Sequence, residues 1–454
     1  MTVAMVVPVI DSGLGNSAYL VDLGGGRGLA VDASRDLRAV RAAAARHGLK
    51  IAFAADTHLH ADFLSGALQL AADDGAQILV SAAGHRSFAH RALADGDEAD
   101  LGGLTLRAWA TPGHTDEHLA YLLLDGPKVL GVFTGGSLLV GAVARTDLSG
   151  PENAEPLARS QYASLRRMLT LPDVTAVYPT HGAGSFCSAP PGAERTTTIG
   201  RERAANPLLA AVDEEAFVKA LLSSLGTYPG YFLRLPAENR RGPAIVEAEP
   251  ELAPLTAGQV RALQDEGVLV IDVRPVAGYA AGHIPGSLAI PLRDAFATWL
   301  GWLVPDPATP VVIVADPGQD LGDLTWQALK IGYENFAGTL SGGMPAWEAA
   351  GHPVASTSLL SPSQIDPAEV IDVRQANEYS SGHLPGARNI ELGALARHAA
   401  DMPAGPVVTM CGHGERATTA ASVLERAGHS TVAVSPDRAQ EWAGATGRAL
   451  ENTA

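Results

Sequence analysis

The stretch Thr57-His58-Leu59-His60-Ala61-Asp62-Phe63-Leu64-Ser65-Gly66 places two histidines and an aspartate between two predicted elements. The apolar run 51–55 before it predicts a buried strand, and the pattern over 68–71 after it predicts a helix. The three polar side chains cannot share one helix face, but on a tight loop they can converge on one cation. Imidazole and carboxylate are ligands of zinc and iron. The stretch therefore predicts a metal site, with a polar turn as the alternative.

Two later turns each carry a histidine beside glycine or proline at the end of an apolar run. They are Thr111-Pro112-Gly113-His114-Thr115 and Pro179-Thr180-His181-Gly182. Four histidines in three such turns favour a metal site over four separate core histidines. Together the motifs resemble the metallo-β-lactamase fold, in particular its glyoxalase II and persulfide dioxygenase branch. That resemblance implies a four-layer αββα sandwich with the metal at one edge of the two sheets.

The resemblance also implies metal-binding positions in this chain. Three side chains match the first metal site of the family: His58, His60 and His114. Two match the second site of its binuclear members: Asp62 and His181. Phe63 stands where binuclear members have histidine, which favours one mononuclear iron(II) site.

The family's metal-binding aspartate is missing, because the segment Phe133-Thr134-Gly135-Gly136 has glycine at position 136. Non-haem iron(II) oxygenases use two histidines and one carboxylate on one face of the iron. We therefore expect weaker iron binding or a substitute ligand, and Asp62 and Asp116 are the nearest carboxylates in the sequence. A three-histidine set, which suits zinc, is the alternative.

Composition limits the function classes. The chain has 454 residues, 46% of them hydrophobic, and a formal net charge of −17, so two or three globular domains are expected. Such acidity disfavours nucleic acid and anionic membranes, because phosphate binding relies on clustered Lys and Arg. No apolar run reaches the length of a membrane span, and residues 1–10 lack the basic start of a signal peptide. With only Cys187 and Cys411 present, no disulfide framework forms, and a cytoplasmic location is predicted.

Residues 1–185 are predicted to form the metallo-β-lactamase-like domain. Strands are expected at 17–21 and 29–32 around a hairpin turn at Gly24–Gly26, followed by a helix over 36–47. Arg145-Thr146-Asp147-Leu148 resembles a GR-x-D stretch of the persulfide dioxygenase branch, with a surface ion pair as the alternative. Residues 186–256 then look like the extension that fused family members carry, with a helix over 212–222 and a Pro-rich linker.

An internal repeat organises the remaining chain. Ile271-Asp272-Val273-Arg274 with Gly282-His283-Ile284-Pro285-Gly286 recurs 100 residues later, as IDVR at 371–374 and GHLPG at 382–386. Each copy predicts strand, helix, strand and helix, and hence a parallel sheet with helices on both faces. With a later CxxGxR, the pattern resembles the rhodanese fold, in which the DVR and GHxPG residues are mainly structural. Domains are expected at 257–356 and 365–454.

The two copies differ in chemistry. In the second, a strand over 407–410 runs into Cys411 at the start of a helix, where backbone N–H groups can stabilise the thiolate that attacks sulfur. We predict catalytic roles for Cys411 and Arg416, with an inert buried thiol as the alternative. The loop residues between them are predicted to bind the substrate: Gly412, His413, Gly414 and Glu415.

The first copy runs from a strand over 311–314 into Ala315-Asp316-Pro317-Gly318-Gln319-Asp320, which has no thiol and is acidic. It predicts an inactive module with a packing or docking role. Cys187 lies six residues after His181, near the expected metal edge. A second redox role is one interpretation for it, and a small buried filler is the favoured one.

The domain order resembles bacterial fusions of persulfide dioxygenase with sulfurtransferase. That resemblance implies oxidation of a low-molecular-weight persulfide by O2 to sulfite at iron(II), and sulfane-sulfur transfer through Cys411 to or from thiosulfate. It also implies a homodimer or homotetramer. Three alternatives stay open: a degenerate metal domain that leaves only a rhodanese-type sulfurtransferase, a glyoxalase II-like zinc hydrolase, and a non-enzymatic sulfur-sensing scaffold.

Overall fold

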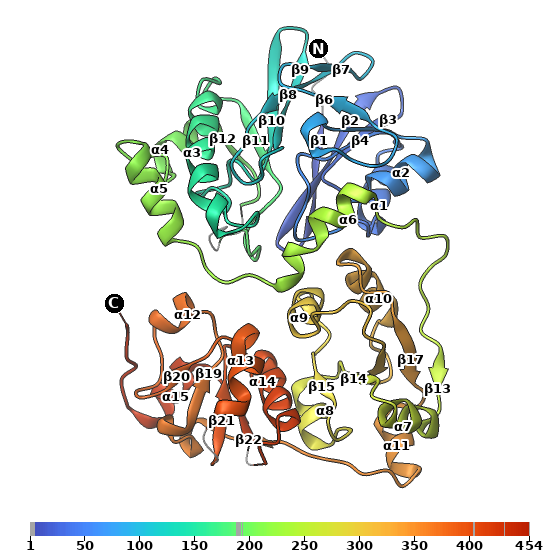
Figure 1. Cartoon of the computed structure of the whole chain (residues 1–454), viewed down its shortest axis with the longest axis vertical. Helices are drawn as coiled ribbons and strands as arrows, with labels where there is room; N and C mark the ends of the chain where they lie inside the picture. The colour runs from blue at the N-terminus through green and yellow to red at the C-terminus, as the bar shows by residue number, and fades with distance from the viewer. Residues whose placement is uncertain (1–4, 188–191, 193, 403–404, 431, 454) are drawn as a thin grey trace. The chain divides into compact units, whose positions relative to one another are not determined.

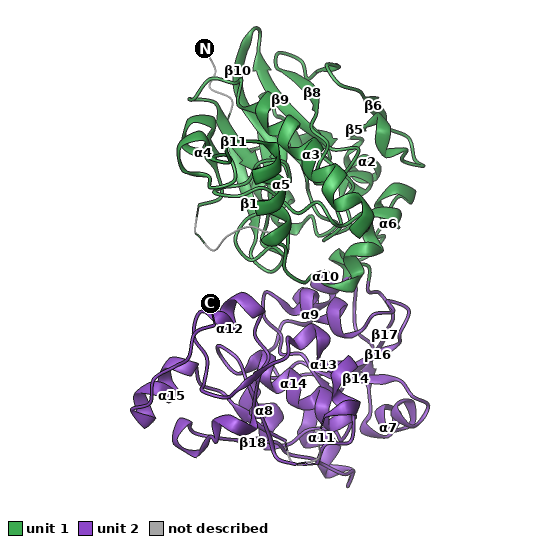
Figure 2. Ribbon diagram, turned by 60° about the vertical axis from the view of Figure 1, so that its left-hand side comes forward, with its two compact units in different colours: residues 1–249, 329–332 green, residues 250–328, 333–454 purple. Residues whose placement is uncertain are grey.

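The computed structural model describes residues 5–187, 192, 194–402, 405–430 and 432–453. The chain divides into two compact units, Met1–Glu249 with Leu329–Gly332 and Pro250–Ala328 with Tyr333–Ala454 (Figure 2). Among the described residues, no helix combines the length and the apolar character that crossing a membrane requires.

Unit 1 contains two six-stranded sheets (Figure 1). The first has the order β1-β2-β3-β4-β5-β6 and the second the order β12-β11-β10-β9-β8-β7. The strands of the first are β1 Val6–Asp11, β2 Asn16–Gly24, β3 Arg27–Val31, β4 Lys50–Ala55, β5 Gln77–Ser81 and β6 Arg91–Leu93. Those of the second are β7 Glu98–Asp100, β8 Thr105–Ala110, β9 Leu119–Asp125, β10 Lys128–Gly135, β11 Ala176–Pro179 and β12 Thr197–Thr198.

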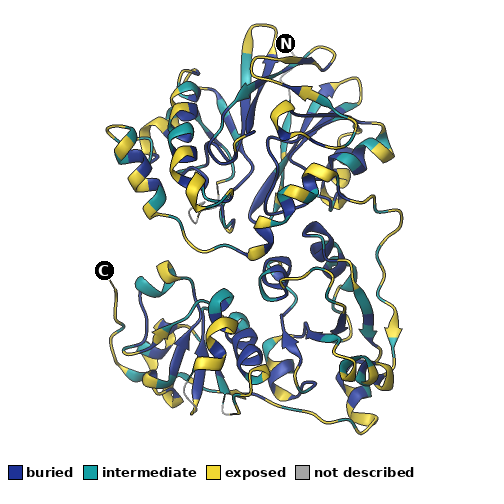
Figure 3. Ribbon diagram, viewed as in Figure 1, coloured by how far each residue is buried: buried dark blue, intermediate teal, exposed yellow. Residues whose placement is uncertain are grey.

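Helices cover the outer face of each sheet, so that unit 1 has three apolar layers between four structural layers. Alternate residues of β2 show why: Leu20 packs toward the outer layer with α1, whereas Tyr19 and Val21 pack between the sheets. The helices on the first sheet are α1 Arg38–Arg46 and α2 Ala67–Asp74, and those packed with the second include α3 Pro151–Met168 and α5 Glu214–Ser223. The αββα sandwich expected for this part of the chain is confirmed (Figure 3).

The predicted local elements of unit 1 agree with this fold. Strands β2 and β3 pair antiparallel around the predicted turn, where Gly24, Gly25 and Gly26 all have positive φ. Residues 199–241, part of the predicted extension, contribute helices to unit 1: α4 Ile199–Ala205, α5, and α6 Leu235–Arg241.

Unit 2 contains two five-stranded sheets with the same topology, and every pairing within them is parallel. The first is β13 Pro254–Leu255, β17 Phe336–Leu340, β16 Val311–Val314, β14 Leu269–Asp272 and β15 Leu288–Ala289. The second is β18 Ser358–Leu359, β22 Val432–Ser435, β21 Val407–Met410, β19 Val370–Asp372 and β20 Arg388–Asn389. The repeat seen in the sequence therefore corresponds to two copies of one parallel α/β fold.

The repeated motif makes the same contacts in both copies. Arg274 pairs with the carboxylate of Asp272 at 2.6 Å and also donates to the carbonyl of Gly282 at 2.6 Å. Arg374 makes the matching contacts with Asp372 at 2.6 Å and with the carbonyl of Gly382 at 2.8 Å. These contacts tie the end of a strand to the loop that carries GHxPG, so they support the structural role expected for the motif.

Helix α14 (Glu415–Arg426) follows the Cys411 loop and is buried on every side over residues 417–424. Part of this burial comes from the first copy, because Ser422 Oγ accepts a hydrogen bond from the backbone N–H of Ala289 at 3.0 Å. Near the end of α14, Glu425 accepts from the hydroxyl of Thr357 at 2.8 Å and lies 3.3 Å from His283 Nε2. Small residues such as Ala420 and Ala421 allow this close packing.

Removing Arg274 should destabilise unit 2 strongly. Arg274→Met leaves the buried carboxylate of Asp272 without its cation, which costs about 3–5 kcal/mol in the free energy of unfolding. Urea unfolding should show that loss, whereas Arg261→Met, which breaks a surface pair with Asp265, should cost less than about 1 kcal/mol. The double variant Asp272→Asn/Arg274→Met should recover part of the loss, and equal effects of Arg274→Met and Arg261→Met would contradict a structural role for the motif.

Candidate functional site

Loops from three places in unit 1 bring histidines together at one edge of the sandwich. His58 follows β4, His114 lies between β8 and β9, and His181 follows β11. All three side chains are buried, and one donor atom from each lies within 4.8 Å of the other two. Residues far apart in the sequence therefore form one cluster, as the three turn motifs predicted.

Hydrogen bonds fix the orientation of the three rings. His114 Nδ1 lies 2.7 Å from the carbonyl oxygen of Arg145, and a carbonyl can only accept, so Nδ1 carries the proton. His181 Nδ1 lies 3.0 Å from Asn16 Oδ1. His58 Nδ1 lies 2.9 Å from Thr57 Oγ1, whose own proton is directed to Asp32 Oδ2 at 2.8 Å.

The three opposite ring nitrogens, Nε2 of His58, His114 and His181, are all buried without a hydrogen-bond partner among the described residues. A buried nitrogen of this kind loses its hydration without compensation unless a cation or a hydrogen-bond partner fills the space. Held Nδ1 protons and converging free Nε2 atoms are how metal-binding histidines are arranged in proteins, so these side chains fit a metal ion.

Asp62 adds a carboxylate to the same cluster. Its Oδ2 accepts from Asn16 Nδ2 at 2.8 Å and lies 3.3 Å from His181 Nδ1, whereas its Oδ1 is buried without a hydrogen-bond partner among the described residues. Burial raises the pKa of Asp62, but the charges of His181 and His60 and the hydrogen bonds from His181 and Asn16 together outweigh it and lower this pKa to about 2. The carboxylate is therefore an anion at neutral pH.

His60 lies next to His58, with ring centroids 4.2 Å apart, but it is not grouped with the other three histidines. Its Nε2 lies 3.2 Å from Asp32 Oδ1, and its donor atoms group with Asp32 and Asp56. The ring stacks on Phe63 with centroids 4.1 Å apart. The structure thus places His60 beside the cluster with two carboxylates, where the sequence comparison had placed it in the first metal site.

Position 136 has no room for the missing aspartate. A Cβ on Gly136 would lie 2.2 Å from Cδ2 and 2.6 Å from Cγ of His114, so the imidazole of His114 occupies that space. Asp116, one of the two carboxylates considered as substitutes, is exposed, which leaves Asp62 as the carboxylate at the cluster.

Sequence reasoning missed His118, which is buried beside the cluster. Its Nε2 accepts from the backbone N–H of Gly136 at 3.0 Å, and its Nδ1 lies 2.8 Å from Thr111 Oγ1. Both nitrogens are therefore engaged with the protein. His118 follows His114 by four residues, but no glycine or proline stands beside it, and this turn context was the feature that identified the other histidines.

Burial sets the charge states of the rings. Burial, reinforced by the neighbouring histidines, holds the pKa of His58 well below its ordinary value and lowers that of His114 to about 3. Burial also acts to lower the pKa of His181, but the charges of Cys187 and Asp62 outweigh it and raise this pKa well above its ordinary value. A positive charge is therefore favoured next to Asp62 and Cys187, and a cation can supply it.

Arg145 connects the cluster to the rest of the unit. It is 1% exposed and pairs with Asp147 at 2.7 Å, while Nη1 donates to the carbonyl of Phe186 at 3.0 Å. Its own carbonyl holds His114. The alternative of a surface ion pair is therefore wrong, because the guanidinium is buried behind the cluster.

In unit 2, Cys411 follows β21 and is 2% exposed. The backbone N–H of Gly414 donates to its Sγ at 3.2 Å. Gly414 has φ +85°, a conformation that favours glycine, and a Cβ there would lie 3.1 Å from Pro436 Cα. The loop is thus folded back over the sulfur at the N-terminus of α14.

Charged side chains surround this loop. Arg416 donates two hydrogen bonds to Glu378, at 2.7 and 2.8 Å, so its guanidinium is held by a carboxylate that the sequence did not identify. His413 is exposed and its Nε2 contacts the guanidinium of Arg438. Gly412 and Glu415 are partly exposed at the same loop. The predicted loop residues are therefore together around Cys411.

The matching loop of the first copy is closed by its own side chain. Gln319 Oε1 accepts from the backbone N–H of Asp316 at 2.8 Å, and its Nε2 donates to the carbonyl of Val273 at 2.8 Å. The side-chain amide of Gln319 therefore bonds to the backbone of this loop and to that of Val273, and residues 315–320 include no cysteine. These contacts support the expected inactive module.

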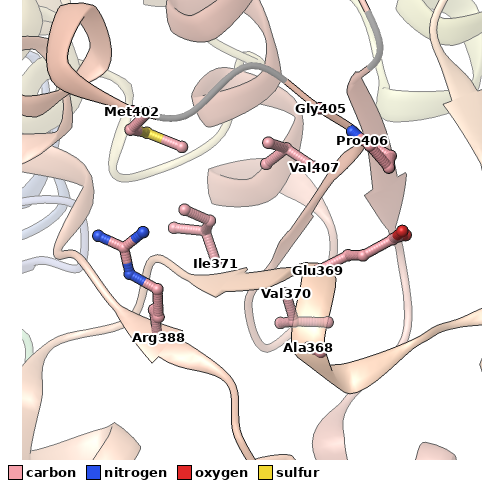
Figure 4. Close-up of a pocket in the computed structure, with 9 residues that line it drawn as sticks. All are labelled: Ala368, Glu369, Val370, Ile371, Arg388, Met402, Gly405, Pro406 and Val407. Atoms are coloured by element: carbon pink, nitrogen blue, oxygen red, sulfur yellow. The ribbon is translucent and has the colours of Figure 1, made fainter.

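A cavity of about 260 Å³ lies elsewhere in the second copy (Figure 4). Its lining includes Val370 and Val407, which begin β19 and β21, whereas Cys411 follows the end of β21. The strands are parallel, so the cavity lies at their N-terminal ends and the thiol at their C-terminal ends. We therefore do not assign the cavity to sulfur transfer.

Comparison with known proteins agrees with both units. The rhodanese-like domain family matches residues 256–350 and 357–445. The mitochondrial persulfide dioxygenase ETHE1 of Homo sapiens is 32% identical over 177 residues, which cover 38% of this chain and 62% of that protein. A hydroxyacylglutathione hydrolase of Methylobacterium sp. (strain 4-46) is 30% identical over 200 residues, covering 38% of this chain and 72% of that protein. The chain belongs to the metallo-β-lactamase-fold family of hydroxyacylglutathione hydrolase and is similar to persulfide dioxygenase, and this domain is fused to two rhodanese-like domains.

A solved structure extends the likeness of this fusion beyond one domain. The metallo-β-lactamase from Staphylococcus aureus subsp. aureus COL superposes with a TM-score of 0.66 at 27% identity, covering 75% of this chain and 99% of that one. The fusion spans 66% and 62% of the lengths of the first curated relatives it matches. These relationships relate unit 1 to metal-dependent enzymes of the metallo-β-lactamase fold and unit 2 to rhodanese-like domains.

Adding even a methyl group at position 136 should disturb the histidine cluster of the fusion. Gly136→Ala forces the ring of His114 to move, and overpacking of this kind costs about 1–3 kcal/mol in the free energy of unfolding. The free energy of unfolding of unit 1, measured with urea, and the metal content of the purified protein should both fall. Gly230→Ala, where no atom lies within 4 Å of the new Cβ, is the control. Unchanged stability and metal content in Gly136→Ala would contradict the conclusion that the ring of His114 fills the space of a side chain at position 136.

Proposed function

We propose that the fusion oxidises a low-molecular-weight persulfide to sulfite in unit 1 and transfers sulfane sulfur through Cys411 in unit 2. One observation carries the first half: three clustered histidines have buried Nε2 atoms without a hydrogen-bond partner among the described residues, and Asp62 lies beside His181. The loop of Cys411, with a backbone N–H directed at its sulfur, carries the second half. The similarity to persulfide dioxygenase and to rhodanese-like domains supports both.

In unit 1, His58, His114 and His181 would hold the metal, with Asp62 as the nearby carboxylate. Bound iron(II) would supply the O2 chemistry, and zinc is the alternative because three histidines suit it. Asn16 orients both His181 and Asp62, and the carbonyl of Arg145 orients His114. These contacts engage the Nδ1 atoms, so Nε2 of His114 and Nε2 of His181 would bind the metal, and the metal would displace the proton of His181.

In unit 2, the thiolate of Cys411 attacks the outer sulfur of thiosulfate. A bond forms between Sγ and that sulfur, the S–S bond of thiosulfate breaks, and sulfite leaves with its electron pair, so that Cys411 becomes a persulfide. The reverse reaction uses sulfite, the product proposed for unit 1, and releases thiosulfate. The N–H of Gly414 stabilises negative charge on Sγ, and Arg416, held by Glu378, provides positive charge for the anions.

A second function is favoured by Gly136. If unit 1 no longer activates O2, the protein acts only as a rhodanese-type sulfurtransferase. Restoring a carboxylate with Gly136→Asp would then raise the iron content only if the ring of His114 moves out of the space that the new side chain needs. Similarity to a hydroxyacylglutathione hydrolase also allows a zinc-dependent hydrolase, which Phe63 and Gly136 disfavour because both positions lack second-site ligands.

Oxygen consumption separates these functions. Protein loaded with iron(II) without air should take up O2 in proportion to an added glutathione persulfide, with sulfite as the product. His114→Ala removes one nitrogen donor and should reduce iron content and uptake by on the order of tenfold or more. Circular dichroism of the variant checks its fold. No uptake by the iron-loaded native protein would refute the oxygenase and leave the sulfurtransferase.

The sulfur transfer has its own test. Cys411→Ser should reduce thiosulfate sulfurtransferase activity to the buffer background, because a hydroxyl does not form a persulfide. Mass spectrometry of the native protein after thiosulfate treatment should show the mass of one added sulfur atom on the peptide that contains Cys411. Iron content should be unchanged in Cys411→Ser, since the thiol lies in unit 2. Activity that survives in Cys411→Ser would refute this assignment.

A further inference from the structure

Cys187 is a buried thiol that the proposed reactions do not use. It is 0% exposed, and one donor atom each of Asp62, His181 and Cys187 lie within 4.8 Å of one another. His181 also belongs to the three-histidine group, so it joins the sulfur to the cluster. The sequence favoured a small buried filler at this position, but the structure surrounds it with potential ligands.

The loop that carries Cys187 is fixed at several points. The backbone N–H of Gly182 donates to the carbonyl of Gly15 at 2.8 Å, and that of Cys187 donates to Ser185 Oγ at 3.2 Å. Arg145, whose carbonyl holds His114, donates through its guanidinium to the carbonyl of Phe186 at 3.0 Å. The same residue therefore positions a ring of the cluster and the peptide next to Cys187.

Two residues grouped with this thiol carry unpaired atoms that could bind a metal. His181 Nε2 and Asp62 Oδ1 are both buried without a hydrogen-bond partner among the described residues. Asp62 and a thiolate side by side would be two buried anions, which is costly without a cation between them. A divalent metal satisfies both anions and the free nitrogen at once. Thiolate sulfur is the form of cysteine that binds metal.

We propose that Cys187 is a metal ligand, and that its sulfur, with His181 and Asp62, supplies the anionic donor that Gly136 cannot supply. The ring of His114 fills the space of a side chain at position 136, so the anion has to enter the cluster from another loop. A mixed set of imidazole, carboxylate and thiolate binds zinc and cobalt as well as iron(II). The inference concerns ligation alone and holds whether or not unit 1 oxidises persulfides.

Cobalt(II) is the probe, because a cobalt–thiolate bond gives a charge-transfer absorption band in the near ultraviolet. The full-length protein, stripped of metal, is titrated with Co(II) without air and without any persulfide. We expect the band in the native protein and in Cys411→Ser, the matched control that leaves Cys187 as the one cysteine. We expect Cys187→Ser to lose the band while it retains the visible bands of bound cobalt.

Three outcomes would overturn the proposal: no charge-transfer band in the native protein, a band that persists in Cys187→Ser, or a band that disappears in Cys411→Ser. Should Cys187→Ser fail to fold, ¹¹³Cd NMR of Cys411→Ser decides, since the cadmium chemical shift distinguishes a sulfur ligand from nitrogen and oxygen ligands alone. A cadmium chemical shift in the range of nitrogen and oxygen ligands alone would refute the proposal that Cys187 is a metal ligand. Neither readout depends on O2 uptake or on sulfur transfer, so failure of the proposed function leaves the test intact.

Discussion

The hydrogen bonds to the Nδ1 atoms of three histidines determine what unit 1 can do. Each acceptor comes from a different part of the chain: the carbonyl of Arg145, the amide of Asn16 and the hydroxyl of Thr57. Since a neutral imidazole has one proton, placing it on Nδ1 leaves Nε2 as a donor to a metal. The two sheets hold the loops that bring these acceptors and rings together at one edge of the sandwich.

Much of the architecture was predictable from the sequence. The three histidine turns indicated the sandwich through their resemblance to a known family, and the repeat with a fixed offset indicated two copies of a parallel α/β fold. The Cys411 loop was equally clear, since glycines and a following helix are local features. Partners that depend on long-range packing were not predictable. Glu378 holds Arg416 from 38 positions away, and no spacing rule announces such a contact.

The metal cluster shows the same limit more sharply. Position in the motif assigned His60 to the first metal site, but packing turns its ring onto Phe63 and toward Asp32. Likewise, the sequence shows at position 136 only that glycine stands in place of the family's aspartate. In three dimensions the ring of His114 occupies the space, so the change affects a neighbour as well as the lost carboxylate. Sequence shows which donors exist, and packing decides where they point.

Helix α14 of the second rhodanese copy packs against the first copy, which has no thiol in its matching loop. The helix begins at the Cys411 loop, and its middle is enclosed on all sides, with Ser422 bonded to the strand of the other copy. A second copy separated from the first would expose the alanines of this face and lose the hydrogen bond from the N–H of Ala289 to Ser422. The first copy therefore supplies a packing surface for α14, a role that needs its shape and no thiol.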